Sequence, residues 1–479
     1  MGATYLKVIT PCIISGGLLG LSFSPSPLLS QALPWIAFLP FLGAAPALTL
    51  KNTIIGSLFF GISCQLIALH WIAETSTWAW LACSLLLSSQ FILWGAIIKL
   101  RKWESAPWKI ASVWTILEIL KQSLPPFGLN SLASAAFTPL FSPLIFLFGE
   151  SGLTFLILLT AAAAANWKKV TPASRAITLL AIVPWFLPNK LASNNPKPQL
   201  ALIALIPSGR NSQPSLLAKE EWMNSLLQET QIAADAAATP DLILWSEGTP
   251  FALATHEKFG QAVINSLLHF PVPLLLTGPK PSLTGTYNSS FLLTPQKERI
   301  NLQEHKKTIL IPGAEFVPNW WPFPPDYQTY QAGDTSQPLI AAFGKLGINI
   351  CSEEISYLHN NRLRQKGAQL LIGSNNHIDL GHWGTIQTFR CARLRAVETQ
   401  THFLRCSNLG ISSLFAPNGD ILWESTAQVP SSHSVPLAHP PSLITCPSVY
   451  SSPWGLLSLC ALFLLPFKNS SRRNTTNSL

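Results

Sequence analysis

Leu346-Gly347-Ile348-Asn349-Ile350-Cys351-Ser352-Glu353-Glu354 joins a short apolar run to a cysteine and two carboxylates. The apolar run predicts a buried strand, and the cysteine stands at its carboxyl end. In open α/β sheets, functional sites collect at the carboxyl ends of strands. Cys351 is therefore a candidate nucleophile, although a single cysteine taken alone is more often a buried structural residue. The rest of the chain has to decide between these two roles.

The composition of the chain is typical of a membrane protein. Of its 479 residues, 48% are hydrophobic and only 11% are charged, whereas about 25% of residues are charged in a soluble domain. The mean hydropathy is +0.31. Long apolar runs are confined to residues 1–190 and 450–467, and the middle of the chain has the composition of a soluble domain.

Charge and cysteine usage exclude several classes of function. The net charge is +9, but no basic stretch alternates with aromatic residues as a base-stacking surface requires. The eight cysteines include no CxxC motif and no spacing paired with histidines, which argues against a zinc site or a disulfide framework. Because a second apolar run follows the first almost at once, the first is interpreted as a retained span rather than a signal peptide.

About seven apolar segments before residue 190, and one near the C-terminus, are candidate membrane spans by length and composition. They lie at 8–23, 34–50, 54–73, 78–100, 108–124, 144–165, 176–187 and 454–467. Lysine and arginine occur in every second loop, while the loops near 24–33, 74–77 and 125–143 carry neither. The basic loops face the cytoplasm by the positive-inside rule. This count puts residues 189–452 on the other side of the membrane.

The middle of the chain alternates between predicted strands and helices. Strands are expected at 200–206, 241–245, 272–277, 287–294, 339–350, 370–374, 403–406, 411–416 and 421–424. Helices are expected at 216–238, 256–269, 358–366 and 385–401. The alternation predicts a sheet covered by helices. A polar linker at 189–198 precedes this part, and a segment rich in proline and serine at 429–446 returns the chain to the last span.

Three residues together form a set suited to acyl transfer. Glu247 follows an apolar strand and can act as a base, and Lys307 can stabilise the oxyanion of a tetrahedral intermediate. A neighbouring base and cation promote the reactive thiolate of Cys351. Taken singly, Glu247 and Lys307 are equally well explained as a solvated strand end and a surface lysine. The sequence contains no GxSxG, P-loop or GxGxxG motif that would suggest other chemistry.

The motifs around these residues resemble the nitrilase superfamily. They are WSEGTP at 245–250, KTILIPGAEFVP at 307–318 and ICSE at 350–353. Combined with the spans, they resemble its membrane-embedded branch, the apolipoprotein N-acyltransferase family. Further similarities are LSFSP at 21–25, ARLRA at 392–396 and RCSNLG at 405–410.

The resemblance implies a multi-span helical bundle joined to an αββα sandwich that carries a Glu-Lys-Cys triad. Glu247 would be the general base, Lys307 the oxyanion stabiliser and Cys351 the nucleophile. It also implies supporting residues around the triad, namely Glu315, Glu353, the backbone N–H of Ser352 and Trp222 on an arm over the site. The expected parts are a bundle at 1–188, an extracytoplasmic catalytic domain at 198–448, a C-terminal span at 453–467 and a basic cytoplasmic tail at 468–479.

The family's activity would be a two-step transfer without metal or cofactor. A phospholipid acyl chain passes through a Cys351 thioester to the α-amine of the diacylglyceryl-modified N-terminal cysteine of an apolipoprotein. The implied setting is a multi-pass monomer in a bacterial inner membrane, with its catalytic domain in the periplasm. Two alternatives stay open: a membrane-tethered amidase acting on a small C–N substrate, and a lipid-binding or transport protein with an inactive domain.

The chain departs from the family pattern in three places. Ser352 replaces an aromatic residue, PGAE at 312–315 replaces PFGE, and SNNHIDLG at 374–381 replaces SNDxWFG. The triad itself is complete. We therefore expect the departures to affect the shape of the substrate pocket rather than the chemistry.

Overall fold

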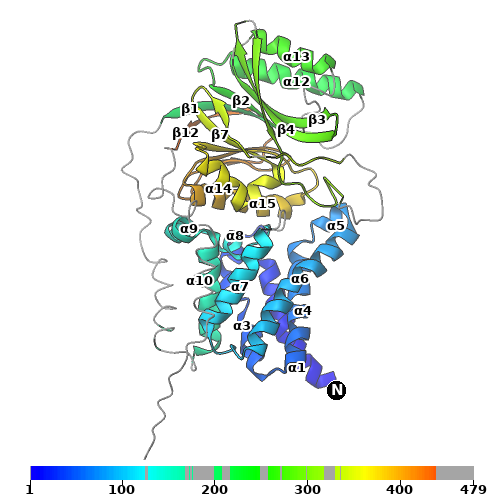
Figure 1. Ribbon diagram of the computed structural model, residues 1–479, viewed down its shortest axis with the longest axis vertical. Coiled ribbons are helices and arrows are strands. Elements are labelled where there is room, and N and C mark those ends of the chain that lie inside the picture. Colours follow the sequence, from blue (N-terminus) through cyan, green and yellow to red (C-terminus); the bar gives the residue numbers. More distant parts are fainter. Residues whose placement is uncertain are drawn as a thin grey trace, which may run out of the picture.

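The computed structural model describes residues 2–123, 128–167, 172, 175, 199–207, 216–248, 257–269, 272–297, 299–317, 329–334 and 336–438. Within these residues the chain forms a helical bundle and an α/β domain, stacked along the long axis of the molecule (Figure 1). The spans expected at 176–187 and 454–467, the linker and the basic tail lie outside the described residues.

The bundle is built from apolar helices that pack around aromatic side chains. They are α1 (Gly2–Leu21), α2 (Pro27–Ile36), α3 (Leu39–Ala44), α4 (Leu50–Ala68), α5 (Ile72–Thr75), α6 (Thr77–Leu100), α7 (Pro107–Gln122), α8 (Leu132–Ala136), α9 (Ser142–Phe148) and α10 (Glu150–Ala165). Phe38 lies edge-on to Phe60, Trp94 and Trp114, with ring centroids 5.0–5.7 Å apart. Such edge-to-face packing is favourable for aromatic rings and gives the bundle a rigid centre.

Three helical segments of the described chain are long and apolar enough to cross a membrane, or four if a bent pair counts as one. They are Pro27–Ala47, Leu50–Ala68, Thr77–Leu100 and the pair Pro139–Phe148 with Glu150–Ala165, bent by 112°. The second expected span therefore begins at residue 27 rather than 34. Ser26 caps this helix, accepting a hydrogen bond from Leu29 N at 3.4 Å, and proline suits the first turn. The total number of spans stays a prediction.

The loops that lack lysine and arginine lie against the α/β domain (Figure 1). Gln387 of the domain donates to the carbonyl of Ala68 at the end of α4, at 2.8 Å. Basic residues lie at the opposite helix ends, with Lys51 in the first turn of α4 and Lys99 in the last turn of α6. The alternation of charge in the sequence thus corresponds to two distinct ends of the bundle.

The α/β domain contains two six-stranded sheets. The first has the order β12-β1-β2-β3-β4-β5, and its strands are β12 (Ser431–Pro436), β1 (Leu200–Ile206), β2 (Leu242–Glu247), β3 (Leu274–Ser282), β4 (Gly285–Gln296) and β5 (Arg299–Lys306). The second has the order β11-β10-β9-β8-β7-β6, and its strands are β11 (Ile421–Ser425), β10 (Ser412–Phe415), β9 (Phe403–Asn408), β8 (Leu370–Asn376), β7 (Gly344–Ile350) and β6 (Leu339–Ala341). Strands β1, β2 and β3 run parallel, as do β7, β8 and β9.

Helices cover the outer face of each sheet, which gives the αββα order of layers predicted from the sequence. Helices α12 (Leu216–Ala234) and α13 (Glu257–His269) pack on the first sheet, and α14 (Tyr357–Gln365) and α15 (Gly381–Thr399) on the second. Leucine and isoleucine side chains fill the space between the sheets. Helix α15 also lies on the bundle, because Leu394 and Val397 belong to the bundle's core (Figure 1).

Two edge strands were missed by the sequence-based expectations. Strand β5 has mostly partly exposed side chains with little apolar alternation, so its pattern is weak. Strand β12 lies in the segment interpreted as an irregular return, and it pairs antiparallel with β1. Its serines and terminal proline are tolerated at a sheet edge, where one side of the strand needs no ladder bonds. The omission of β5 matters most because Lys307 follows it directly.

Candidate active site

Cys351 stands immediately after β7, as predicted, at the start of a 3₁₀ turn that runs Cys351–Ile355. Its backbone has φ = 49°, in the left-handed region. A residue with a side chain is strained there by about 1–3 kcal/mol and needs surrounding contacts to hold it. The side chain is partly exposed and packs against the core between the sheets.

Contacts from three sides hold this turn, which we call the nucleophile turn. Ser352 Oγ donates to the carbonyl of Ile309 at 3.2 Å. Arg405 of β9 binds both carboxylate oxygens of Glu354, at 2.8 and 2.9 Å. Asn375 Nδ2 of β8 donates to the same carboxylate at 3.0 Å. These buried charged contacts fix the backbone that carries Cys351.

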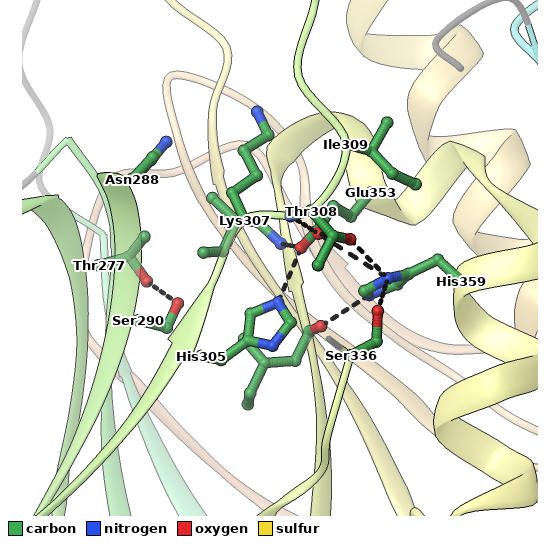
Figure 2. A network of polar contacts seen from close by, with 12 residues as sticks. Thr277, Asn288, Ser290, His305, Lys307, Thr308, Ile309, Ser336, Glu353 and His359 are labelled. Atoms are coloured by element: carbon green, nitrogen blue, oxygen red, sulfur yellow. Dashed lines mark hydrogen bonds and ion pairs between the residues drawn. The ribbon is translucent and has the colours of Figure 1, made fainter. Parts of the chain in front are cut away.

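Glu353 is fully buried and is the centre of a polar network (Figure 2). Its carboxylate accepts hydrogen bonds from Thr308 N and Oγ1, each at 2.7 Å, from Ile350 N at 2.9 Å and from His305 Nε2 at 3.1 Å. Burial raises the pKa of Glu353, but the neighbouring His359 and His305 outweigh burial and hold it below its usual range. Glu353 is therefore an anion that ties the segment after Lys307 to the nucleophile turn.

In the described part of the chain, His305, Glu353 and His359 form a group with the donor atoms of a metal site. Hydrogen bonds occupy these atoms, however. His359 Nε2 lies 3.0 Å from the carbonyl of Ile348 and must donate to it, and its Nδ1 lies 2.9 Å from Ser336 Oγ. Both oxygens of Glu353 already accept hydrogen bonds. This arrangement is a hydrogen-bonded network that positions the loop and the turn.

Lys307 is buried, with 1% of its surface exposed, so its interpretation as a solvated surface lysine is wrong. Its backbone N–H donates to Asn288 O at 2.8 Å, and its Nζ lies 2.7 Å from Glu315 Oε1. Burial lowers the pKa of Lys307, but Cys351, Glu315 and Glu247 together raise it above its usual value. A cation is therefore held beside the cysteine.

Glu315 orients this lysine while holding its own loop. Glu315 Oε1 contacts Lys307 Nζ, and Oε2 accepts from Ile311 N at 2.8 Å. The two oxygens thus have separate partners, one on the lysine and one on the backbone of the loop. The role of Glu315 as a supporting carboxylate, which the family resemblance implies, stays a prediction.

Glu247 ends β2, and each of its carboxylate oxygens accepts a hydrogen bond. Asn288 Nδ2 donates to Oε1 at 2.8 Å, and Asn376 N donates to Oε2 at 2.9 Å. Burial raises the pKa of Glu247, while Lys307 and these hydrogen bonds oppose the rise. A carboxylate whose pKa moves upward toward neutrality is suited to accept a proton and return it.

Hydrogen bonds link the segments that carry these groups, since Asn288 donates to Glu247 and accepts from Lys307 N, and Ser352 donates to Ile309 O. Burial raises the pKa of the Cys351 thiol, the anion of Glu247 raises it further, and the cation of Lys307 opposes both. Glu315 also raises it. The structure therefore brings together the four residues, from the end of β2, the segment after β5 and the nucleophile turn.

Two residues that hold Glu247 have no recognisable signal in the sequence. Asn288 is a polar residue within β4, and its position facing Glu247 depends on the pairing of β3 with β4. Asn376 belongs to the divergent stretch 374–381, which also reaches the bundle: Thr75 Oγ1 of α5 donates to the carbonyl of Asp379 at 3.3 Å. The stretch expected to shape the substrate pocket therefore also orients the carboxylate of Glu247.

Trp222 lies on α12 and is partly buried against the core between α12, α13 and the first sheet. A position on an arm over the site stays a prediction for this residue.

Comparison with known proteins supports this architecture along most of the chain. Residues 15–163 match the model of the apolipoprotein N-acyltransferase N-terminal domain, and residues 235–431 match that of the carbon-nitrogen hydrolases. The first range covers the bundle. The second contains Glu247, Lys307 and Cys351.

Curated relatives with the name apolipoprotein N-acyltransferase are similar over long stretches. The protein of Haemophilus ducreyi is 25% identical over 87% of this chain and 88% of its own length. That of Nitrosomonas europaea is 25% identical over 66% of this chain and 65% of its own length, so this match spans slightly less than two thirds of the relative. Among solved structures, the nitrilase-superfamily protein Nit3 of Saccharomyces cerevisiae is 19% identical with a TM-score of 0.39, covering 57% of this chain and 97% of its own.

Proposed function

Since the chain belongs to the apolipoprotein N-acyltransferase family of the carbon-nitrogen hydrolases, we propose that it N-acylates lipoproteins. The acyl group passes through a thioester on its own Cys351. The acyl donor is a membrane phospholipid, and the acceptor is the diacylglyceryl-modified N-terminal cysteine of an apolipoprotein. The observation that carries the proposal is that hydrogen bonds join the segments of Glu247, Lys307 and Cys351. Asn288 donates to Glu247 and accepts from Lys307 N, and Ser352, next to Cys351, donates to Ile309 O. A base, a cation and a thiol within reach of one another are what acyl transfer through a thioester requires.

In the first step Glu247 takes the thiol proton of Cys351, and the thiolate attacks the ester carbonyl of the phospholipid. The ammonium of Lys307 and the backbone N–H of Ser352 stabilise the oxyanion. The ester C–O bond then breaks, the glycerol oxygen receives the proton from Glu247, and a lysophospholipid leaves. Cys351 now carries the acyl chain as a thioester.

In the second step the α-amine of the acceptor attacks the thioester carbonyl. Glu247 takes a proton from this amine, and the same cation and N–H stabilise the second oxyanion. The C–S bond breaks, the sulfur recovers a proton from Glu247, and an N-acyl amide is released. The sequence from ester to thioester to amide involves no oxidation and needs no metal or nucleotide.

The bundle gives this reaction access to lipid substrates. Apolar side chains such as Trp78, Leu85 and Leu86 are exposed on α6, as expected for a surface that faces acyl chains. We propose a multi-pass monomer in a bacterial inner membrane, with a transmembrane bundle at 1–188, a periplasmic catalytic domain at 198–448, a last span at 453–467 and a cytoplasmic tail at 468–479. The position of the basic residues away from the α/β domain supports this orientation.

Mass spectrometry of the purified protein with phospholipid tests the proposal. We expect one acyl mass on the peptide that contains Cys351, and its loss when a diacylglyceryl lipopeptide is added and converted to the N-acyl product. Cys351→Ala should abolish both signals. Cys83→Ala, at a partly exposed cysteine of α6, is the matched control and should keep both.

Product formation by Cys351→Ala at the wild-type rate would refute the thioester route. Release of ammonia from small amides, without acylation of Cys351, would instead favour the tethered amidase.

A further inference from the structure

Arg395 of α15 lies between the bundle and the α/β domain, with 1% of its surface exposed. Its NH2 is 3.0 Å from Glu150 Oε1, its Nε is 3.2 Å from Glu398 Oε2, and its NH1 donates to the carbonyl of Ile355 at 3.3 Å. One guanidinium therefore contacts the bundle, its own helix and the nucleophile turn. The planar fork of arginine suits such divergent contacts, which a lysine cannot make at once.

On the bundle side, Arg395 binds the point where α9 and α10 meet. Gly149 separates the two helices with φ = 66°, and the helices are bent by 112° there. Glu150 is the first residue of α10, and its N–H donates to Glu398 Oε1 at 2.9 Å. Its Oε2 accepts from Ser131 Oγ at 2.8 Å. The bend of the apolar helix pair is thus joined to α15 by buried charges.

On the catalytic side, Arg395 holds the last residue of the nucleophile turn, which begins at Cys351. The bundle touches the same residue, because a Cβ placed on Gly128 would lie 3.2 Å from Ile355 Cγ2. Glu353 fixes the beginning of the turn through Ile350 N. The two ends of the turn are therefore held by different parts of the molecule, the first by the network of Glu353 and the last by Arg395 and the bundle.

We propose that Arg395 is a positioning residue that makes the conformation of the Cys351 backbone depend on the bend between α9 and α10. The left-handed backbone of Cys351 needs such restraint, and the contact to Ile355 supplies it from the membrane-facing side. The consequence for the reaction rests on the proposed function. The effect on the backbone and exposure of Cys351 is independent of the proposed function.

The test uses Arg395→Lys in the full-length protein, because a lysine keeps the positive charge beside Glu150 and Glu398 but loses the fork. We expect single-turnover acylation of Cys351 by phospholipid to slow about tenfold, as for the loss of a hydrogen bond from a charged donor. The KM for phospholipid should stay unchanged, and the thermal unfolding midpoint should fall by no more than in the two control variants described next. Alkylation of Cys351 by iodoacetamide, which needs no lipid, should become faster because the loosened turn exposes the thiol.

Arg390→Lys and Arg393→Lys are matched controls on the same helix. Arg390 NH2 donates to the carbonyl of Ser24 at 2.8 Å, and the Arg393 guanidinium lies 5.0 Å from the Phe137 ring centroid. Within the described residues these contacts go to the bundle and not to the nucleophile turn, so both variants should keep wild-type acylation and alkylation rates.

Unchanged alkylation and acylation in Arg395→Lys would overturn the inference. So would rate losses of the same size in the two control variants. If wild-type protein gives no acyl-enzyme at all, the proposed function fails, while faster alkylation of Arg395→Lys would still support the positioning role.

Discussion

The two sheets of the α/β domain are similar in order and in their parallel centres, but they differ in what covers them. The outer helices of the first sheet, α12 and α13, point away from the bundle, whereas α15 of the second sheet lies on it (Figure 1). Glu247 and the segment with Lys307 follow strands of the first sheet, and Cys351 follows a strand of the second. The proposed nucleophile therefore belongs to the half next to the bundle, and the base and cation belong to the distant half.

The carboxylates of the two halves also differ in electrostatics. Glu247 and Glu353 are both buried, yet burial keeps the pKa of Glu247 raised, while His359 and His305 overcome burial and lower that of Glu353. Glu247 receives hydrogen bonds mainly from neutral amides, and Glu353 has two imidazoles beside it. Glu247 is thus the carboxylate better suited to exchange a proton, and Glu353 is held as an anion that stabilises the nucleophile turn.

Removing the cation of the first sheet should have the largest effect. Lys307→Met is expected to lower kcat by about 10²–10³-fold, the loss typical of an oxyanion-stabilising group. Since Lys307 lowers the pKa of Cys351, the variant should raise that pKa and slow alkylation by iodoacetamide at pH 8. Single-turnover acylation and the pH profile of alkylation measure the two effects.

Lys306→Met is the matched control for this prediction. Lys306 is the neighbouring residue, partly exposed, with its ammonium 4.1 Å from the Tyr287 ring centroid rather than beside the cysteine. Both rates should stay close to wild type. Equal losses in the two variants would show that the charge acts through stability and not at the site.

Breaking the network that joins the two halves should have an intermediate effect. In Glu353→Gln the new NH2 group cannot accept the bonds that one carboxylate oxygen now receives, so the free energy of unfolding should fall by about 3 kcal/mol. The folded-state pKa of Glu353 is lowered, so its contribution is present above the ordinary carboxyl pKa and disappears in wild type as the pH falls below it.

Denaturation at pH 7 and at acidic pH measures this contribution. The difference between wild type and Glu353→Gln should shrink as the pH falls. Glu424→Gln, at an exposed position of β11 in the same sheet, should leave the free energy of unfolding close to that of wild type at each pH. If Glu353→Gln lowers the free energy of unfolding by the same amount at every pH, the charge of Glu353 is not what stabilises the turn.

The sequence predicted the parts of the site that follow from local pattern. The unbroken apolar run of β7 identified the strand before Cys351, and β2 before Glu247 was found in the same way. Strand β5 was missed because it lies at an edge with weak alternation. The network of Glu353 could not be predicted, since its partners His305 and Thr308 lie 48 and 45 residues away in the chain. Only the packing of one sheet on the other brings them together.

The contact between the two parts of the molecule was even less accessible to sequence reasoning. Glu150 and Glu398 are 248 residues apart and belong to different domains. Each lies in a segment whose pattern is fully explained by its own helix. A buried glutamate at a helix end suggests a partner, but its identity depends on how α15 rests on the bundle.

Glu398→Gln should have the smallest effect on the free energy of unfolding at neutral pH. It should chiefly change how this free energy depends on pH. Burial raises the pKa of Glu398 to about 7, with Glu150 adding to the rise and Arg395 opposing it. Because the folded-state pKa exceeds the unfolded one, the contribution to stability is complete below the unfolded pKa and is lost as the pH rises through about 7. Wild type should therefore lose stability from pH 5 to pH 8.

Thermal unfolding across this pH range tests the prediction. Glutamine keeps an acceptor for Glu150 N but does not ionise, so the variant should show a flatter pH dependence and differ from wild type by about 1 kcal/mol or less at pH 7. Asp235→Asn, at an exposed position directly after α12 on the first sheet, is the control and should keep the wild-type slope. An unaltered slope in Glu398→Gln would mean that the carboxylate stays ionised beside Arg395. The interface would then be a permanent ion cluster, and the difference between the two sheets would not depend on pH.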